Sequence, residues 1–516
     1  MKRRIEIRMR HIRIDERAFL AKCASARRRH QSHRRPDLEA QTRTGAHSTM
    51  PKNILIFADG TGQIGGVRPD QQLSNIYKLF RASRVGPDSP IDPREQVAYY
   101  EPGLGTSNAA GNVRLGLWER LKSWAGLAVG LGFSTNVIDC YEAILKRYEP
   151  GDRIYLFGFS RGGYTVRALA NVLNLCGVPT TDGKGGALPR AGRALRAIAT
   201  EAVVKVYEHG SGHPRKRFEA QREAIARRFR SKYGSGNDPA RGDVYPEFIG
   251  VFDSVAALGL PVPARLALLA VAALALGAVS TALAALTSHW FDWTQWAVAT
   301  LVFLAGVSVA ALSYARVTFR WASKDVRCGT RPWHFAVWNS KNYDRYLDPR
   351  IPVARHALAI DETRLAFGRV TWGGSRNADQ PGDTRGRFRQ RWFAGNHSDI
   401  GGSYPEEESR LSDIALHWMI EEAMAGPHPI VLDRSKLHLH PDPLGPQHSE
   451  VFARQQGAWW MRLFKWSSAP RPIQEQAELD PTVLERFAAA RVVACDRSAA
   501  YRPEALRGHH QVTHFY

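Results

Sequence analysis

Short runs of apolar residues alternate along most of the chain with stretches in which apolar residues recur every three or four positions. The short runs are typical of strands buried on both faces, and the longer period is typical of helices. The expected strands cover 53–58, 96–100, 153–159, 247–253 and 391–395, and the expected helices cover 74–83, 135–148, 160 onward and 412–424. This order predicts an α/β fold with a mostly parallel sheet and helices on both of its faces.

Two long uncharged stretches, 266–288 and 293–315, interrupt this alternation. Each is long enough, at ~1.5 Å per residue, to cross a hydrocarbon core of about 30 Å. Basic residues flank the two outer ends of these stretches, namely Arg265, Arg316 and Arg320. The turn that connects the stretches is flanked by Trp290 and Trp293. The positive-inside tendency then predicts a two-span membrane hairpin with the flanking soluble parts in the cytoplasm. A buried helical hairpin or an apolar lid is the alternative, because alanine supplies much of the first stretch.

These patterns divide the chain into five parts. They are a basic, disordered arm at 1–49, a first part of the α/β core at 50–257, the hydrophobic hairpin at 258–320, a second part of the core at 321–434, and an accessory segment at 435–516. The arm lacks the apolar region of a secretory signal, and a strand follows Met50 at once, so a start at Met50 is an open alternative. We assign no chemistry to the accessory segment.

The charge balance favours anionic partners without choosing among them. With 71 basic and 49 acidic residues the chain carries a formal net charge of +22, which suits phospholipid headgroups or nucleic acid. The 5 cysteines form no CxxC pair, which argues against a zinc knuckle or a dense disulfide framework. We expect neither a metal nor an organic cofactor.

A serine stands between two glycines where a predicted strand passes into a predicted helix, in the run Gly-Phe-Ser-Arg-Gly. At a nucleophile elbow such a turn lifts the serine hydroxyl above the sheet, and side chains two positions away would collide where strand and helix pack. We therefore interpret Ser160 as a nucleophile and Gly158 and Gly162 as the glycines of its elbow. The predicted fold is therefore α/β-hydrolase-like, and the hydrophobic hairpin is an insertion in it.

A base and an orienting carboxylate follow the serine in the order that this fold requires. Asp253 ends a predicted strand, and His397 lies just beyond another in a glycine-rich loop. Asp399 is a secondary candidate that could orient the imidazole or only brace its own loop, and His448 is the alternative base.

The glycine-rich turn after the first strand is the expected source of one oxyanion donor. We expect the amides of Gly60 and Thr61 to act together with that of Arg161, the residue after the nucleophile. Asp59 is a further secondary candidate: a phosphatase motif Asp-x-Asp-Gly-Thr would need an aspartate at 57, where the chain has Phe57. A second glycine run at 100–112 could line the pocket.

The substrate is suggested by location. The hydrophobic hairpin begins about a dozen residues after Asp253, and a segment of that length reaches at most ~40 Å, which would hold the site near a bilayer. Basic helices between 190 and 233 could contact anionic headgroups, or simply be solvated. The expected partners are a lipid substrate and the bilayer, with no specific nucleic acid.

These blocks, taken together, resemble the first family of type VI secretion lipase effectors. The similar blocks, in order, are FADGTG, YEPGLGT, GFSRGGYTVR, VFDSVAALG, ARHALAIDE and WFAGNHSDIGGSY, spanning about 53 to 405. The resemblance implies an α/β-hydrolase domain with Ser160 as nucleophile, Asp253 as acid and His397 as base of a phospholipase or related esterase. Secretion and immunity partners would be unspecified.

The chain departs from the family in two places. The usual first block has an aromatic residue and Asn after Phe-Asp-Gly-Thr, whereas this chain has Ala58 before Asp59 and Gly62 with Gln63 after Thr61. The hydrophobic hairpin fits a resident membrane enzyme as well as it fits a secreted effector. A soluble ester hydrolase with an apolar lid, or a non-catalytic basic scaffold that binds membranes, are the other functions left open.

Overall fold

The structure is a computed structural model. It describes residues 50–63, 65–66, 72–103, 131–236, 241–255, 262–287, 295–326, 331–338, 344–372, 386–456, 467–495 and 497–516. The predicted arm at 1–49, most of the second glycine run and the turn of the hairpin lie outside the described residues. Residues 50–516 form one compact unit, and the inner boundaries predicted at 257, 320 and 434 remain predictions.

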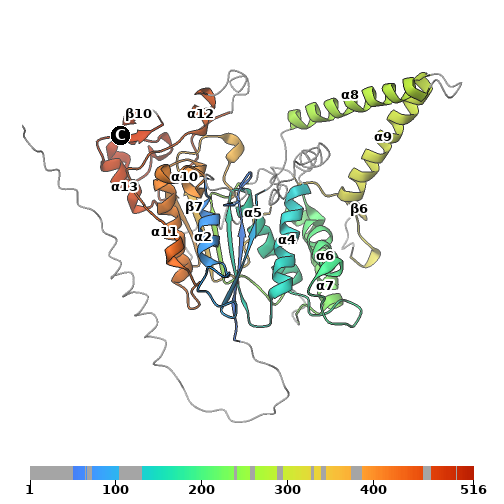
Figure 1. Cartoon of the computed structure of the whole chain (residues 1–516), viewed down its shortest axis with the longest axis horizontal. Coiled ribbons are helices and arrows are strands. Elements are labelled where there is room, and N and C mark those ends of the chain that lie inside the picture. The colour runs from blue at the N-terminus through green and yellow to red at the C-terminus, as the bar shows by residue number, and fades with distance from the viewer. Residues whose placement is uncertain are drawn as a thin grey trace, which may run out of the picture. The chain divides into compact units, whose positions relative to one another are not determined.

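A six-stranded sheet forms the centre of the molecule (Figure 1). Its strands, in spatial order, are β2 (Gln96–Glu101), β1 (Asn53–Ala58), β3 (Arg153–Phe159), β4 (Phe248–Phe252), β7 (Val353–Ala359) and β8 (Phe388–Phe393). Every neighbouring pair is parallel, which confirms the α/β class. Strand β7 was not predicted as a strand, and β8 begins three residues earlier than expected.

Helices cover both faces of this sheet because successive residues of the central strands point to opposite sides. On β1, Ile54 and Ile56 face one core and Leu55 and Phe57 face the other. The first core contains α4 (Leu131–Arg147), α5 (Arg161–Cys176), α6 (Gly192–Thr200) and α7 (Arg215–Tyr233). The second contains α2 (Asn75–Ser83) and α11 (Arg410–Met424). A continuously apolar strand is thus buried on both sides, as its sequence requires.

The accessory segment packs against the edge of the same sheet and forms a third core. Leu358 of β7 and Trp392 of β8 share this core with Val483 and Phe487 of α13 (Pro481–Ala488). The remaining elements there are α12 (Glu450–Gln456) and the pair β9 (Val492–Ala494) and β10 (Arg497–Ala499). Residues 467–516 therefore lie beside the strands that carry the predicted site.

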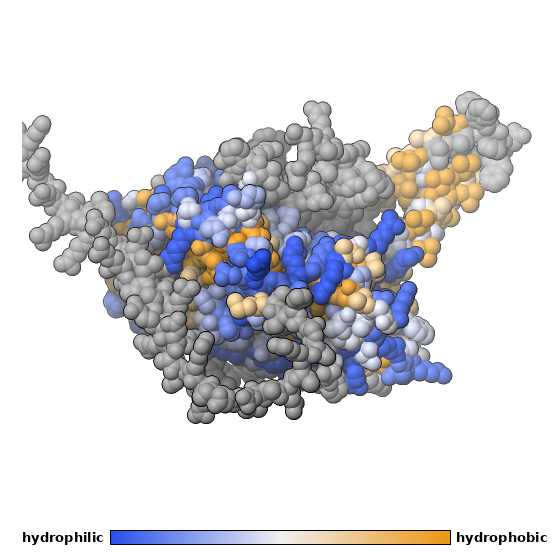
Figure 2. All heavy atoms as spheres, turned by 60° about the horizontal axis from the view of Figure 1, so that its bottom comes forward, coloured by the Kyte–Doolittle hydropathy of each residue, from blue (hydrophilic) through white to orange (hydrophobic). Residues whose placement is uncertain are grey.

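The hydrophobic hairpin consists of α8 (Val262–Thr287) and α9 (Gln295–Thr318). The helices approach closely, since a Cβ on Gly306 would lie 2.8 Å from the Leu276 side chain. Figure 2 shows that hydrophobic residues dominate the visible side of this hairpin. Among the described residues one stretch, Ala297–Arg316, is long and apolar enough to cross a membrane, and it is exposed along almost its whole length.

The prediction of two membrane spans is therefore not supported. Within the described side chains of α8 the apolar stretch covers Ala270–Ala282, which is shorter than a membrane span requires. The predicted solvated alternative for the basic helices fits α7 better than headgroup binding does. Three of its cations are paired with carboxylates: Arg215 with Glu219 and Asp344, Arg228 with Asp325, and Lys232 with Glu201.

Candidate active site

Ser160 stands at a sharp turn between β3 and α5. Its φ of 57° and ψ of −123° form a backbone conformation that non-glycine residues rarely adopt. The neighbouring strand holds this turn in place: the Ser160 N–H donates to the Phe252 carbonyl at 3.0 Å, and the Val255 N–H donates to the Ser160 carbonyl at 3.3 Å. The hydroxyl is thereby fixed at the carboxyl edge of the sheet.

The two glycines of the turn are required by close packing. A Cβ on Gly158 would lie 2.5 Å from the Gly162 carbonyl oxygen, and a Cβ on Gly162 would lie 2.1 Å from that of Ala58. Both obstacles are main-chain atoms, which cannot rotate away as side chains do. The glycine spacing in the sequence therefore follows from the contact between β1, β3 and the start of α5.

Three side chains predicted from distant parts of the sequence meet at this turn. His397 Nε2 lies 2.8 Å from Ser160 Oγ, and His397 Nδ1 lies 2.5 Å from Asp253 Oδ2. Because a carboxylate only accepts, Nδ1 carries the proton and Nε2 is the acceptor for the serine hydroxyl. All three residues are buried, so the chain of hydrogen bonds is shielded from bulk water.

His397 is the first residue of the short helix α10 (His397–Gly401), which follows β8. Asn396 and Asp399 close a capping box at the start of this helix. The imidazole is also confined by two aromatic rings, Phe159 and Phe367, whose centroids lie 4.7 and 5.0 Å from its own. The ring is therefore held by its helix cap and its neighbours as well as by its hydrogen bonds.

Asp253 follows β4 and is completely buried. Its carboxylate accepts from the Ala359 N–H at 3.2 Å and from both terminal nitrogens of Arg471, at 2.6 and 3.0 Å. Burial alone would raise its pKa, but the positive charge of Arg471 and the hydrogen bond from His397 outweigh burial and hold the pKa well below its usual range. Asp253 is thus kept ionised.

Sequence reasoning missed Arg471. It lies in the accessory segment, to which we assigned no chemistry, and 218 positions separate it from Asp253. Its guanidinium also donates to the carbonyls of Ala359 and Phe367, at 3.1 and 2.7 Å. No local pattern identifies this arginine, because only the packing of the accessory segment on β7 and β8 brings it to the site.

The predicted oxyanion loop lies beside the nucleophile. A Cβ on Gly60 would lie 3.4 Å from Ser160 Cβ, and one on Gly103 would lie 1.5 Å from the Gly60 carbonyl oxygen. The Gly60 N–H, however, donates to Asp59 Oδ1 at 2.7 Å. Since that amide is already engaged, the candidate donors narrow to the amides of Thr61 and Arg161. The Arg161 side chain donates to Thr61 Oγ1 and so links the two donor segments.

Asp59 braces this loop and bonds no member of the Ser160–His397–Asp253 group. Its carboxylate accepts from Ser74 Oγ at 2.5 Å and from the Tyr100 hydroxyl at 2.7 Å. Burial raises its pKa to about 6, against the opposing effect of these hydrogen bonds. A buried carboxylate whose donors are all neutral differs in this respect from Asp253.

Asp399 does not orient His397. It accepts from the Asn396 N–H at 2.9 Å within its own loop and from His448 Nδ1 at 2.7 Å. His448 in turn lies 3.1 Å from Glu408 Oε2 and stacks on Tyr404. The alternative base is therefore committed to a second cluster of side chains that braces the loop behind α10.

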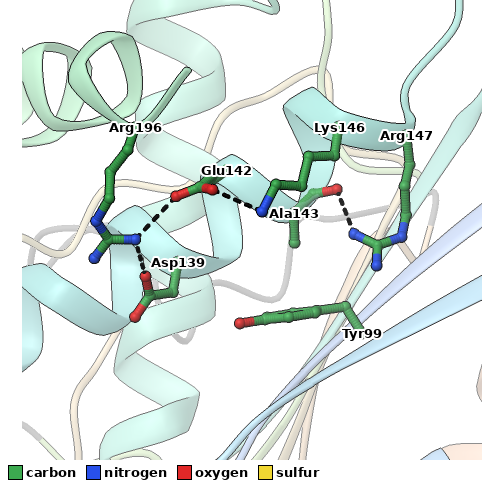
Figure 3. A pocket seen from close by; sticks show the side chains of 7 residues that line it. All are labelled: Tyr99, Asp139, Glu142, Ala143, Lys146, Arg147 and Arg196. Atoms are coloured by element: carbon green, nitrogen blue, oxygen red, sulfur yellow. Dashed lines mark hydrogen bonds and ion pairs between the residues drawn. The ribbon is translucent and has the colours of Figure 1, made fainter. Parts of the chain in front are cut away.

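Two other charged features of the molecule are structural. Arg167 of α5 is buried and donates to the carbonyls of Val370 and Thr371 at 2.7 and 2.8 Å. A surface hollow over β2, α4 and α6 is lined by charged side chains that point toward one another (Figure 3). There Arg196 bridges Asp139 and Glu142, and Lys146 also pairs with Glu142.

Among the described residues no group of three or more histidine, cysteine, aspartate or glutamate side chains is arranged to hold a metal ion. The chemistry available at the site is that of an activated hydroxyl, a histidine that accepts its proton, and a carboxylate fixed in its charged form.

Comparison with known proteins shows similarity over most of the chain. Residues 52–422 match the family described as "T6SS, Phospholipase effector Tle1-like, catalytic domain". The uncharacterized protein YEL023C of Saccharomyces cerevisiae is 35% identical over 136 residues, which are 26% of this chain and 19% of that protein.

Two solved structures are also similar at 16% identity. An uncharacterized protein from Pseudomonas aeruginosa has a TM-score of 0.33, with 82% of this chain and 50% of that chain covered. The structure of the Tle1 effector bound to the VgrG spike of the type VI secretion system has a TM-score of 0.27, with 72% and 57% covered. The chain thus spans about a fifth of the yeast protein and about half of each solved chain.

Proposed function

Because the chain belongs to the family of Tle1-like phospholipase effectors of the type VI secretion system, we propose that it is a lipolytic serine hydrolase. Its substrate is an ester of a phospholipid or a related acyl lipid. The observation that carries this proposal is the continuous hydrogen-bonded series from Asp253 through His397 to Ser160, at a strained turn that holds the hydroxyl against the imidazole.

The reaction proceeds by acyl transfer. His397 Nε2 accepts the Ser160 proton as Oγ bonds to the ester carbonyl carbon, and the oxyanion that forms is held by the Thr61 and Arg161 amides. The bond to the leaving alcohol then breaks as His397 returns the proton to its oxygen. Water, deprotonated by His397, attacks the acyl-serine, releases the fatty acid and restores the serine.

Asp253 contributes by holding the imidazole in one tautomer and by stabilising the imidazolium that forms twice in each cycle. Its pKa lies well below the usual range, so it stays charged at neutral pH. The pairing with Arg471 is compatible with this role, because the carboxylate keeps an oxygen for the histidine.

A lipid substrate is favoured by family membership and by the exposed apolar hairpin that enters the chain between Asp253 and His397. We propose that α9 associates with a membrane and keeps the site near its surface. A secreted effector is the placement that the family suggests, and a hairpin that inserts into a target membrane is consistent with it.

The test is lipid product analysis with the full chain on phosphatidylglycerol and phosphatidylcholine vesicles. Ser160→Ala is expected to lower fatty acid release by about 10⁴-fold or more with an unchanged circular dichroism spectrum. Ser435→Ala, at a serine whose hydroxyl donates to Asp433, is the matched control and keeps full activity. Equal activity of Ser160→Ala and the wild type would overturn the proposal.

The alternatives give different results in the same experiment. A soluble ester hydrolase with an apolar lid would cleave short-chain soluble esters and would remain in the supernatant after carbonate extraction of membranes. A non-catalytic scaffold would bind vesicles in a salt-sensitive way, and a fluorophosphonate would not label Ser160.

A further inference from the structure

A short two-stranded ribbon directly follows α9 in the chain. It consists of β5 (Phe319–Trp321) and β6 (Trp333–Phe335), paired antiparallel with Phe319 opposite Phe335, Arg320 opposite His334 and Trp321 opposite Trp333. Because side chains alternate between the faces of a ribbon, one face carries all four aromatic residues. The other face carries Arg320 and His334. We call these two strands the aromatic ribbon.

The polar face of the aromatic ribbon is turned toward the protein. His334 is buried, bonds the His209 carbonyl at 2.5 Å and stacks on the Phe218 ring at 3.9 Å. The Arg320 guanidinium lies 4.0 Å from Glu208, and both of these side chains are nearly buried. These contacts fix the ribbon to α7 and to the short helix Tyr207–Gly210 that precedes it.

The aromatic face is turned away from the protein. Phe319, Trp321, Trp333 and Phe335 are 39%, 61%, 46% and 45% exposed, respectively. Three of the rings form one patch, because the Phe319 centroid lies 6.2 Å from that of Trp333 and 5.7 Å from that of Phe335, and Trp321 lies opposite Trp333 in the ribbon. This arrangement is the reverse of a surface ribbon in water, which buries its apolar face and exposes its polar one.

The position of the ribbon in the chain indicates what covers this patch. The apolar stretch Ala297–Arg316 ends three residues before Phe319, and the Ala336 N–H donates to the Thr318 carbonyl at 2.7 Å. The ribbon therefore stands at the foot of a helix that is long enough, at ~1.5 Å per residue, to span about 30 Å. Aromatic residues gather at that level of a membrane, beside the headgroups.

The helix itself argues for lipid rather than for a protein partner. Its exposed large apolar residues spread over about 220° of the circumference at 100° per residue; they are Leu301, Leu304, Val307, Val309, Leu312 and Tyr314. A helix that docks on a protein groove presents one stripe, whereas a helix surrounded by acyl chains is apolar on all sides.

We propose that the aromatic ribbon seats in the boundary between the headgroups and the acyl chains of a phospholipid bilayer. There it fixes the depth and orientation of the catalytic domain at the foot of α9. This surface is the one through which the enzyme of the proposed function would reach its lipid substrate. Binding of the protein to phospholipid vesicles tests the proposal independently of hydrolysis.

The experiment uses the full chain carrying Ser160→Ala, so that the vesicles stay intact. The double substitution Trp321→Ser and Trp333→Ser is compared with Leu444→Ser and Val493→Ser, two apolar residues of similar exposure, 47% and 46%, elsewhere on the molecule. Co-sedimentation with phosphatidylglycerol and phosphatidylcholine vesicles is expected to weaken about tenfold or more in the tryptophan variant, and to stay unchanged in the control.

A second measurement reports depth. Lipids brominated near the headgroup end of the acyl chain quench tryptophan fluorescence in the bound protein, and the tryptophan variant loses this part of the quenching. Unchanged partition and quenching in that variant would overturn the proposal. So would a solution dimer that dissociates on the same substitution, since the patch would then be covered by a second copy. The same tryptophan substitutions are also made in the chain that keeps Ser160. Its hydrolysis of a soluble ester is expected to stay unchanged, which shows that weaker vesicle binding does not come from a damaged active site.

Discussion

The catalytic group and the hairpin with its aromatic ribbon both break the rule that polar residues lie outside and apolar residues inside, but in opposite directions. Around Ser160 the molecule buries an aspartate, an arginine and a histidine. Along α9 it exposes leucines and valines, and on the ribbon it exposes two tryptophans and two phenylalanines. The first exception is compensated within the protein and the second is not.

The two regions differ in where their unusual side chains find interaction partners. Every buried charge of the catalytic group has a complementary group within hydrogen-bonding distance, so the energetic cost of burial is offset internally. The described part of the hairpin offers its apolar side chains to the surroundings, and the polar face of the ribbon that follows it lies against the protein. The catalytic group is complete as it stands, whereas the hairpin becomes complete only when something apolar covers it.

A comparison within the site sharpens this point. Asp59 and Asp253 are equally buried, yet the pKa of Asp59 is raised and that of Asp253 is lowered. Asp59 has only neutral donors around it, while Asp253 faces the guanidinium of Arg471. A nearby opposite charge, rather than the number of hydrogen bonds, decides which of the two carboxyl groups has the lower pKa.

The largest expected effect is that of removing the cation from the buried pair. Arg471→Met leaves the Asp253 carboxylate buried without its charged partner, which costs about 3–5 kcal/mol in the free energy of unfolding. Loss of the positive charge also raises the pKa of Asp253, so the acidic limb of the pH profile for ester hydrolysis moves to higher pH. Urea unfolding measures the loss of stability. Kinetics on a soluble ester, below the unfolding temperature of the variant, measure the shift of the pH profile.

Arg486→Met is the matched control for this change, because Arg486 is a buried arginine that donates to the carbonyls of Pro443 and Gly445. It should lower stability and leave the pH profile where it was. Arg471→Lys, which keeps the charge, should restore most of the profile. If Arg471→Met and Arg486→Met give the same profile, Arg471 is structural and does not position the carboxylate.

The next effect is a dependence of stability on pH that runs opposite for the two carboxylates. The pKa of Asp59 is about 6 in the folded chain against 3.8 as its ordinary value, so the folded state keeps the proton longer. The free energy of unfolding should then fall as pH rises from about 4 to 6, by about 1.4 kcal/mol per unit. The contribution of Asp253, whose pKa is lowered, is present above pH ~4 and is lost below it.

Asp59→Asn isolates this dependence. Its amide keeps neutral hydrogen bonding at the site but does not titrate, so the difference in stability between wild type and variant should change by about 3 kcal/mol across that window. A difference that stays constant from pH 4 to 7 would contradict the raised pKa.

The smallest expected effect on the free energy of unfolding comes from a substitution on the exposed surface of α9. Leu312 is 71% exposed on α9, so Leu312→Ser should change the free energy of unfolding in lipid-free solution by no more than about 0.5 kcal/mol. Leu156→Ser, at a fully buried position of β3, should cost several times more by the same measurement. A loss of more than about 2 kcal/mol for Leu312→Ser would mean that the hairpin packs on the protein in solution, as a lid would.

Much of the fold was predictable because its signals are local. Buried strands in a parallel sheet are continuously apolar, and the helices between them carry the 3.6-residue period, so β1, β3 and β4 and helices α2, α4 and α11 were expected within a few residues. The end of α8 was expected within one residue, but among the described residues only α9 contains a stretch long and apolar enough to span a membrane. Strand β7 was overlooked because its apolar run is interrupted by Arg355 and His356.

By itself the sequence determined the turn at Ser160, since the glycines at 158 and 162 are dictated by main-chain atoms a few residues away or on the adjacent strand. It also marked Asp253 and His397 by their places after strands. Only the tertiary structure decided the partners: Arg471 for Asp253, His448 for Asp399, and the outward aromatic face of the ribbon. A hydrogen-bond partner that is 49 or 218 positions away leaves no periodicity in the chain, and whether a face is buried depends on which element packs against it.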